Sequence, residues 1–334
     1  MTKTQLRDRM RAVLTAGALP ILIVPMLSLV ALPGKAGPQA SSSGDADATQ
    51  PYRISVDVGL VVLNPVVRDR SGSFASNLSE QDFEVYEDGV RQSIRLFRHE
   101  DLPVTVGLVV DHSASMGRKL PEVIESVRTF ARSSNPADEM FVVNFNEKVT
   151  LGLPGPMRFT NRPGELEAAI DQAPVTGQTA LYDAVIEAQT RLGAGTRDKK
   201  VLIVISDGGD NASRHSLAEA LKVSEQSGTV VYTIGIFDAE DADRNPGVLR
   251  RFAQATGGEA FFPGQLAEVA GICEAIARDI RNQYTVGYIS GNAAKPGTWR
   301  SIRVVAGATG HGKLRVRART GYLAGDTEAK TAAK

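Results

Sequence analysis

Apolar and polar positions divide the middle of the chain into alternating strands and helices. Five short apolar segments predict strands at residues 104–111, 140–145, 200–206, 230–237 and 259–262. Apolar residues at helical spacing predict helices that begin near Leu120, Leu181, Ser216 and Leu266. The third strand contains an unbroken apolar run, which is typical of a strand covered on both faces. This alternation predicts an α/β fold with a doubly wound, mostly parallel sheet flanked by helices.

Period-two alternation predicts further strands on both sides of this region. Before it, polar or small residues alternate with Ile54, Val56, Val58 and Leu60. Alternating segments near residues 284–288, 302–304 and 314–318 follow it. We expect residues 52–100 and 282–324 to form one small antiparallel β-sandwich-like domain, with residues 101–281 inserted into it. Two separate small sheets would leave more strand edge exposed.

A tight turn is predicted within the first of these β segments. Asp88-Gly89 stands between two alternating stretches, residues 83–87 and 90–94. Both turn residues tolerate the positive φ that a two-residue hairpin loop requires. The segment therefore predicts a β-hairpin.

The N-terminus has the charge pattern of an export segment. Four basic residues precede residues 12–34, which carry no charge. We interpret residues 1–36 as a signal peptide, with an uncleaved N-terminal membrane anchor as the alternative. Either one places the remainder outside the cytoplasm, in a periplasmic or extracellular location or anchored in the cytoplasmic membrane and facing outward. The small polar residues of segment 37–51 predict a flexible linker, and residues 325–334 predict a disordered tail.

Composition narrows the expected partners. The 38 Lys and Arg residues balance 38 Asp and Glu residues, so the net charge gives no argument for binding of nucleic acid. The chain contains one cysteine, Cys273, which therefore cannot form an intrachain disulfide.

It lies in an apolar helical stretch, which favours a buried structural thiol over a nucleophile.

Oxygen-bearing side chains gather where two predicted strands end. Asp111, Ser113 and Ser115 end or follow the first strand, Asp207 follows the third, and Thr179 lies in a glycine-containing loop before a helix. Parallel sheets bind ligands beyond the carboxyl ends of their strands, so we expect these side chains to converge. Hydroxyl and carboxylate oxygens suit Mg²⁺ rather than zinc. Because the hydroxyls donate little charge, such an ion would still attract an outside carboxylate.

Each piece alone also has an ordinary structural interpretation. Asp and Ser are common in turns, Asp207-Gly208 alone is most often a turn, and Thr179 alone is most often a helix N-cap. An enzymatic alternative is a Mg²⁺-dependent hydrolase or phosphatase with Asp111 as nucleophile. That chemistry needs a second carboxylate two residues later, where Ser113 stands.

Two neighbouring features have alternative interpretations. His112 is interpreted as an exposed loop residue rather than a pH sensor or ligand contact. Asn211-Ala212-Ser213 fits the short pattern of a glycosylation acceptor, without other support.

Three segments contain the oxygen-bearing residues: Asp111 to Ser115, the loop with Thr179, and Asp207-Gly208. In this order, they resemble the metal-ion-dependent adhesion site of von Willebrand factor type A domains. The resemblance covers about residues 101–281. It implies that Ser113, Ser115 and Thr179 bind one divalent ion directly, while Asp111 and Asp207 contact it through water. One departure is Ala114, where the family usually has glycine, and alanine would cost stability if its φ were positive.

The flanks resemble those of a bacterial subfamily of exported proteins that carry this domain. The matching motifs are Ser79-Glu80-Gln81-Asp82-Phe83, Tyr86-Glu87-Asp88-Gly89, Arg281-Asn282-Gln283-Tyr284, Gly297-Thr298-Trp299-Arg300 and Arg319-Thr320-Gly321-Tyr322. The implied function is not enzymatic. It is cation-dependent binding of a partner protein through an exposed Asp or Glu, in an adhesion or scaffold role, with Mg²⁺, Mn²⁺ or Ca²⁺. The alternatives are the hydrolase and a structural module with a non-functional ion site.

Overall fold

The computed structural model describes residues 59–238, 243–292, 297–308 and 312–324. The expected signal peptide or anchor, the linker and the C-terminal tail lie outside these residues, as do Ile54, Val56 and Val58. Within the described ranges, no helix has both the length and the apolar character needed to span a membrane.

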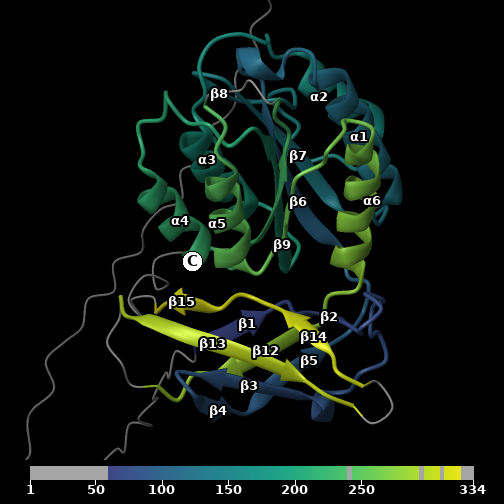
Figure 1. Cartoon of the computed structure of the whole chain (residues 1–334), viewed down its shortest axis with the longest axis vertical. Helices are drawn as coiled ribbons and strands as arrows, with labels where there is room; N and C mark the ends of the chain where they lie inside the picture. The colour runs from purple at the N-terminus through teal and green to yellow at the C-terminus, as the bar shows by residue number, and fades with distance from the viewer. Residues whose placement is uncertain (1–58, 239–242, 293–296, 309–311, 325–334) are drawn as a thin grey trace, which may run out of the picture. The chain divides into compact units, whose positions relative to one another are not determined.

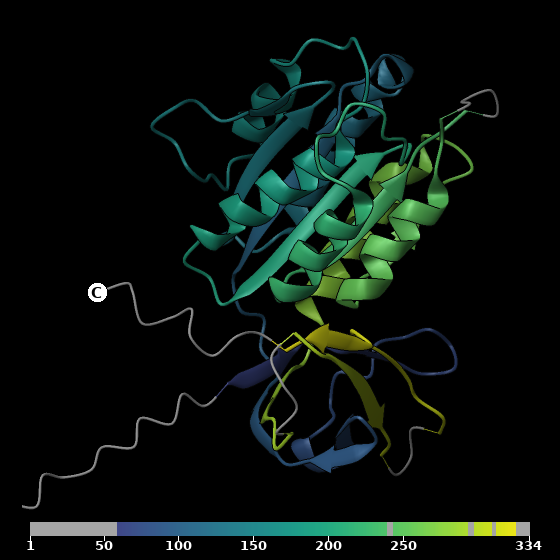
Figure 2. The same ribbon diagram turned by 90° about the vertical axis from the view of Figure 1, so that its left-hand side faces the viewer.

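A six-stranded sheet forms the centre of the α/β region, which we define as residues 104–281. Its order is β11-β10-β9-β6-β7-β8, and all neighbouring pairs run parallel except β7 and β8 (Figures 1 and 2). The strands are β6 (Val104–Asp111), β7 (Glu139–Phe145), β8 (Val149–Leu151), β9 (Lys199–Ser206), β10 (Val230–Gly235) and β11 (Ala260–Phe261). The predicted doubly wound, mostly parallel sheet is therefore confirmed. The antiparallel edge strand β8 was not predicted.

Helices cover both faces of this sheet. On one side α1 packs against α2 and α6, and on the other α3 and α5 pack against α4 (Figure 1). The helices are α1 (Leu120–Ser133), α2 (Pro163–Asp171), α3 (Leu181–Gly193), α4 (Leu217–Gln226), α5 (Pro246–Thr256) and α6 (Glu268–Arg281). The sequence interpretation missed α2 and α5. Both begin at a proline, and α5 ends at Gly257 with φ 80°, so start and stop signals were present.

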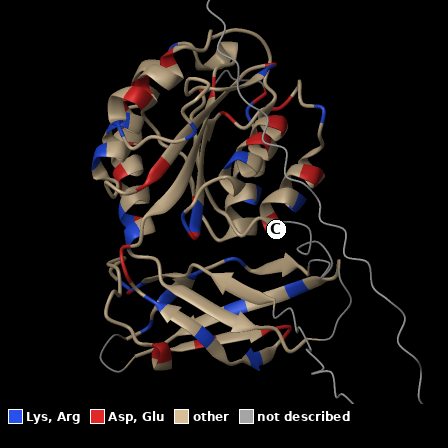
Figure 3. Cartoon of the chain, turned by 180° about the vertical axis from the view of Figure 1, so that it is seen from behind, with Lys and Arg blue, Asp and Glu red and all other residues tan. Residues whose placement is uncertain are grey.

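Burial of the central strands explains why they carry so few charges. Every residue of β6 is buried, and seven of the eight residues of β9 are buried. Charged residues lie mainly on the helices, the loops and the outer strands, whereas the central strands contain few of them (Figure 3). The charged residues of the central strands therefore lie at the strand ends, where the loops begin.

Antiparallel strands from both ends of the described chain form a second region, here called the β region (residues 60–98 and 285–323). Its sheets have the orders β1-β12-β5, β15-β13-β3-β4 and β14-β2. The strands are β1 (Leu60–Leu63), β2 (Val66–Arg68), β3 (Phe83–Glu87), β4 (Val90–Gln92), β5 (Ile94–Arg98), β12 (Thr285–Ile289), β13 (Trp299–Ala306), β14 (Arg315–Arg317) and β15 (Gly321–Leu323). Strands before the α/β region thus pair with strands after it. The sequence interpretation missed β2 and β15.

The β region contains the predicted hairpin and a buried polar cluster. Asp88 has φ 47° and Gly89 has φ 81°, and the two residues join β3 to β4. Beside this turn the buried carboxylate of Glu87 accepts hydrogen bonds from Tyr288 at 2.6 Å and from Arg300 at 3.2 Å. Tyr322 donates a third at 3.0 Å. Residues from separate motifs of the two flanks therefore meet in one core.

Candidate metal site

The first part of the site is a tight turn at the end of β6. Asp111 is the last residue of β6, and its Oδ1 accepts a hydrogen bond from the backbone N–H of Ser113 at 2.8 Å. A short 3₁₀ helix, η2 (Ala114–Met116), follows directly. Asp commonly bonds the N–H two residues on, and this bond turns the chain at the sheet edge. The turn brings the two serine hydroxyls within 3.1 Å of each other.

Asp207 completes a row of three oxygens. Because β9 is paired with β6, the residue that follows β9 lies beside the turn after β6. Ser115 Oγ donates to Asp207 Oδ2 at 2.7 Å. Ser113 Oγ, Ser115 Oγ and Asp207 Oδ2 therefore form consecutive hydrogen-bond contacts across two loops. Asp207 Oδ1 accepts the N–H of Gly209 at 2.9 Å, which fixes the orientation of the carboxylate.

The Asp111 carboxylate lies behind this row and is fully buried. Its Oδ2 accepts a hydrogen bond from Ser206 at 2.6 Å, so both carboxylate oxygens have protein partners. Burial raises the pKa of Asp111 to about 6, and the nearby charge of Asp207 also raises it. Such a carboxylate can orient the serine turn and supply negative charge. It is poorly placed for attack on a substrate.

The loop that contains Thr179 lies against the Asp111 turn. Thr176 N–H donates to the carbonyl oxygen of His112 at 3.0 Å, and Ala114 N–H donates to that of Gly177 at 3.3 Å. These two bonds hold the Thr179 loop against the Asp111 turn. Thr179 is buried with 7% exposure. The N-cap of α3 is Ala180, so the simple N-cap interpretation of Thr179 is wrong.

The structure shows the backbone conformation of Ala114 and the burial of His112, which both lie next to Ser113. Among the described residues, Asp88 is the one non-glycine residue with positive φ, so Ala114 adopts a backbone conformation that alanine tolerates. The interpretation of His112 as an exposed loop residue is wrong, because the side chain is 1% exposed. Its Nε2 lies 3.1 Å from Asn144 Oδ1, beneath the site.

The donor set fits a hard divalent cation. In the described part of the chain, no three His, Cys, Asp or Glu residues are grouped to hold a metal. The row Ser113, Ser115 and Asp207 supplies three oxygens, and Mg²⁺ prefers oxygen ligands with several coordination positions left to water. Ser115 is half-buried and Ala114 is exposed, so solvent reaches this edge. The oxygens of these residues therefore fit Mg²⁺.

Three supporting residues were missed by the sequence interpretation. Ser206 holds Asp111, Asn144 connects His112 to the carbonyl oxygen of Ala169, and Asn211 contacts Thr179. The position of Ser206 at the end of an apolar strand was a signal for it. The contacts of Asn144 and Asn211 join residues far apart in the chain, and no local pattern indicates them.

The fold and site together define an α/β protein with a hydroxyl and carboxylate cluster at the carboxyl edge of a parallel sheet. The family model of the von Willebrand factor type A domain matches residues 105–272, which is half of the chain. The chain therefore belongs to the von Willebrand factor type A family.

Comparison with solved structures gives similar chains of low sequence identity. BatB from Bacteroides thetaiotaomicron is 16% identical, with 53% of this chain and 98% of that chain covered and a TM-score of 0.43. A von Willebrand factor type A protein from Catenulispora acidiphila is 13% identical, with 81% and 76% covered and a TM-score of 0.48. The vWF domain of the type V pili tip protein Mfa5 from Porphyromonas gingivalis is 16% identical, with 54% and 95% covered and a TM-score of 0.45. Comparison with curated proteins gives no match.

Proposed function

We propose that this protein binds a partner protein through a divalent cation, and that an acidic side chain of the partner occupies one coordination position. The observation that carries the proposal is the row formed by Ser113, Ser115 and Asp207. Two of its three members are neutral hydroxyls. An ion held by few negative ligands keeps a strong affinity for a further carboxylate. Membership of the von Willebrand factor type A family supports the same role.

Thr179 is assigned to this ion as a third hydroxyl ligand, and Asp111 and Asp207 are assigned water-mediated contacts. The loop bonds that hold the Thr179 loop against the Asp111 turn support the assignment of Thr179. Membership of the von Willebrand factor type A family supports the assignment of Asp111 and Asp207. The ion is Mg²⁺, with Mn²⁺ or Ca²⁺ as substitutes that also prefer oxygen ligands.

We place the binding region outside the cytoplasm. The basic N-terminal residues and the uncharged segment 12–34 support export, through a signal peptide or a membrane anchor. An adhesion or scaffold role follows for a protein that presents a cation-dependent binding edge in that location.

The contacts of Asp111 count against the hydrolase alternative. A nucleophilic carboxylate must reach its substrate, whereas Asp111 is 0% exposed and both of its oxygens accept protein hydrogen bonds. The position two residues later is Ser113, which cannot act as the carboxylic acid or base that such a mechanism needs.

Ion binding and partner binding test the proposal together. Calorimetric titration with Mg²⁺ and Mn²⁺ would compare the wild type with Ser113→Ala, Asp111→Ala and Thr179→Ala. Thr190→Ala is the matched control, because that hydroxyl lies within α3 and donates to Ile186 of the same helix at 3.1 Å. We expect the three site variants to lose ion affinity and the control to keep it.

A pull-down from an extracellular extract, in Mg²⁺ and in EDTA, then tests the partner. Binding that needs Mg²⁺ and is lost in Ser113→Ala supports the proposal. Binding that is unaffected by EDTA and by Ser113→Ala overturns it. Phosphatase turnover that disappears in Asp111→Asn would replace it with the hydrolase.

A further inference from the structure

Asn211 connects the loop that contains Thr179 to the loop that contains Asp207. Its side-chain Oδ1 accepts the backbone N–H of Thr179 at 2.9 Å. Its own backbone N–H donates to the carbonyl oxygen of Thr179 at 3.0 Å, and the N–H of Ala212 donates to the same oxygen at 3.0 Å. Both backbone polar groups of Thr179 are therefore held by one short segment.

The amide of Asn211 also contacts a third loop, the one that precedes α5. Its Nδ2 donates to Asp243 Oδ2 at 3.3 Å. A backbone N–H can only donate and a carboxylate can only accept, so these two partners together need the paired acceptor and donor of an amide. Asp243 belongs to the loop that contains Asn245, whose N–H donates to the carbonyl oxygen of Asp207 at 3.0 Å. Asn211 thus joins three loops around the candidate ion.

The segment after Asn211 is itself fixed against the start of α3. Asp210 Oδ2 accepts the N–H of Tyr182 at 3.0 Å, and Ser213 Oγ accepts the N–H of Asp183 at 3.1 Å. The first N–H groups of a helix lack partners within it, and the N-cap Ala180 has no side-chain acceptor, so these contacts replace a cap.

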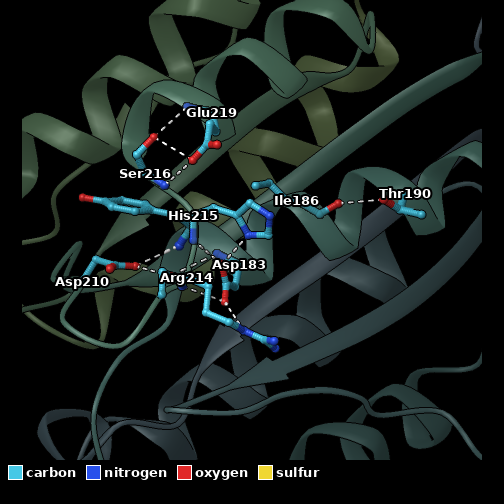
Figure 4. Close-up of polar contacts among 10 residues, drawn as sticks. Asp183, Ile186, Thr190, Asp210, Arg214, His215, Ser216 and Glu219 are labelled. Carbon is cyan, nitrogen blue, oxygen red and sulfur yellow. Dashed lines mark hydrogen bonds and ion pairs between the residues drawn. The ribbon is translucent and has the colours of Figure 1, made fainter.

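The side chain of Asp183, in the first turn of α3, contacts the loop that follows Asn211. Its carboxylate accepts the backbone N–H groups of Arg214 at 3.1 Å and His215 at 3.0 Å, and it lies 2.6 Å from His215 Nδ1 (Figure 4). The loop from Asp210 to His215 and the first turn of α3 therefore hold each other at both ends. Asn211 lies between this rigid segment and Thr179.

We propose that Asn211 is a positioning residue for the divalent cation, because it fixes the backbone of Thr179 at the place where the threonine hydroxyl can reach the ion. This inference rests on the proposed function. It gives Asn211 a role other than glycosylation, since both ends of its amide already have partners within the chain. Groups that orient metal ligands typically change metal affinity by about 10- to 100-fold when they are removed.

Three variants separate positioning from general support of the loop. Asn211→Ala removes the acceptor for Thr179, whereas Asn211→Asp keeps an acceptor and gives up the donor to Asp243. Ser213→Ala is the matched control, because it removes loop contacts to Asp210 and Asp183 without contacting Thr179. The probes are Mg²⁺ and Mn²⁺ alone, titrated by calorimetry, and the unfolding midpoint of each variant is measured separately in EDTA.

We expect Asn211→Ala to bind Mg²⁺ about tenfold more weakly than the wild type. Asn211→Asp and Ser213→Ala should stay within about threefold, although Ser213→Ala lowers the unfolding midpoint in EDTA. The inference is overturned if Asn211→Ala binds Mg²⁺ as tightly as the wild type, or if Ser213→Ala loses as much affinity. If Asn211→Ala does not fold, an Asn211→Asp affinity as weak as that of Ser113→Ala overturns it, and wild-type affinity supports it. A wild type that binds neither ion overturns the proposed function as well.

Discussion

Ser115 Oγ donates a hydrogen bond to Asp207 Oδ2 at 2.7 Å, although the two residues are 92 positions apart in the chain. This bond joins the loop after β6 to the loop after β9. It therefore holds the two serine hydroxyls next to the Asp207 carboxylate. Asp207 also raises the pKa of the buried Asp111 through its negative charge. Two carboxylates that are held close together in a buried place favour a cation between or beside them.

Asp207→Asn should therefore have opposite effects on ion binding and on stability. An amide keeps the oxygen that accepts from Gly209 but removes one negative charge near Asp111. We expect Mg²⁺ affinity to fall at least about tenfold, because the variant removes a negative charge beside the ion. In EDTA the free energy of unfolding should stay equal or rise by about 1 kcal/mol. Calorimetry and urea unfolding measure the two effects, and a large loss of stability in EDTA would show that Asp207 has a structural role instead.

The α/β region is connected to the β region through Asp279, which is 2% exposed. This α6 carboxylate lies 3.1 Å from Arg68 of β2, pairs with Arg317 of β14 and accepts the Tyr232 hydroxyl at 2.6 Å. Asp279→Ala would leave two arginines and a buried tyrosine without this acceptor. Removing one partner of a buried ion pair typically costs about 3–5 kcal/mol, so we expect a loss of that size in urea unfolding.

Another ion pair on the same helix provides the control. Glu274 and Arg278 lie 3.6 Å apart, with side-chain exposures of 47% and 60%. Glu274→Ala should cost less than about 1 kcal/mol, because exposed pairs are screened by solvent. Equal losses for Asp279→Ala and Glu274→Ala would contradict the importance of the Asp279 cluster.

Local patterns predicted most of the fold because burial and periodicity agree there. Residues 104–111 were predicted as one strand and form β6 with all of its residues buried. Prediction was weaker at the sheet margin, where β8 has three residues, of which two are exposed, and no apolar run. Helix α2 was missed although a proline marks its start, since it has few buried positions. Short marginal elements depend on tertiary contacts that no local window contains.

The candidate site was predictable only in part, for the same reason. Strand ends indicated that Asp111, Ser113, Ser115 and Asp207 would converge, and the hydrogen bonds bring these four together. The role of Asn211 depends on contacts with Thr179 and Asp243, each 32 residues away. His112 was misplaced because its burial depends on Asn144 of the neighbouring strand.

Cys273 should be chemically inert in the folded protein. The thiol is 1% exposed, and burial raises its pKa to about 12, so almost no thiolate forms at neutral pH. We expect an aromatic disulfide reagent to label Cys273 only as fast as the protein unfolds, with labelling that accelerates through the urea transition. Rapid labelling without urea, at a rate independent of stability, would contradict this prediction.

Lys199 should make stability depend on pH in the alkaline range. It is 6% exposed in β9, and its Nζ lies 3.3 Å from the carbonyl oxygen of Gln283. Burial, together with the charge of Arg281, lowers the pKa of Lys199 to about 8. The unfolded value is about 10.4, so between these limits the unfolded state binds more protons. The contribution of Lys199 to stability therefore increases as pH rises from about 8 to about 10.4. Below pH 8 the folded state contains the charged ammonium, and the full free-energy cost of burying it lowers stability.

Lys199→Met removes this titration. At pH 7 the variant should be more stable than the wild type by up to about 3 kcal/mol, since the difference in pKa is about 2.4 units. That advantage should shrink steadily between pH 8 and pH 10, because the wild-type lysine is increasingly neutral when folded. Urea unfolding at pH 7, 8, 9 and 10 measures the trend, and Lys222→Met, at an exposed position of α4, provides the baseline. A difference between Lys199→Met and the wild type that stays constant from pH 7 to pH 10 would show that the buried ammonium does not titrate in this window.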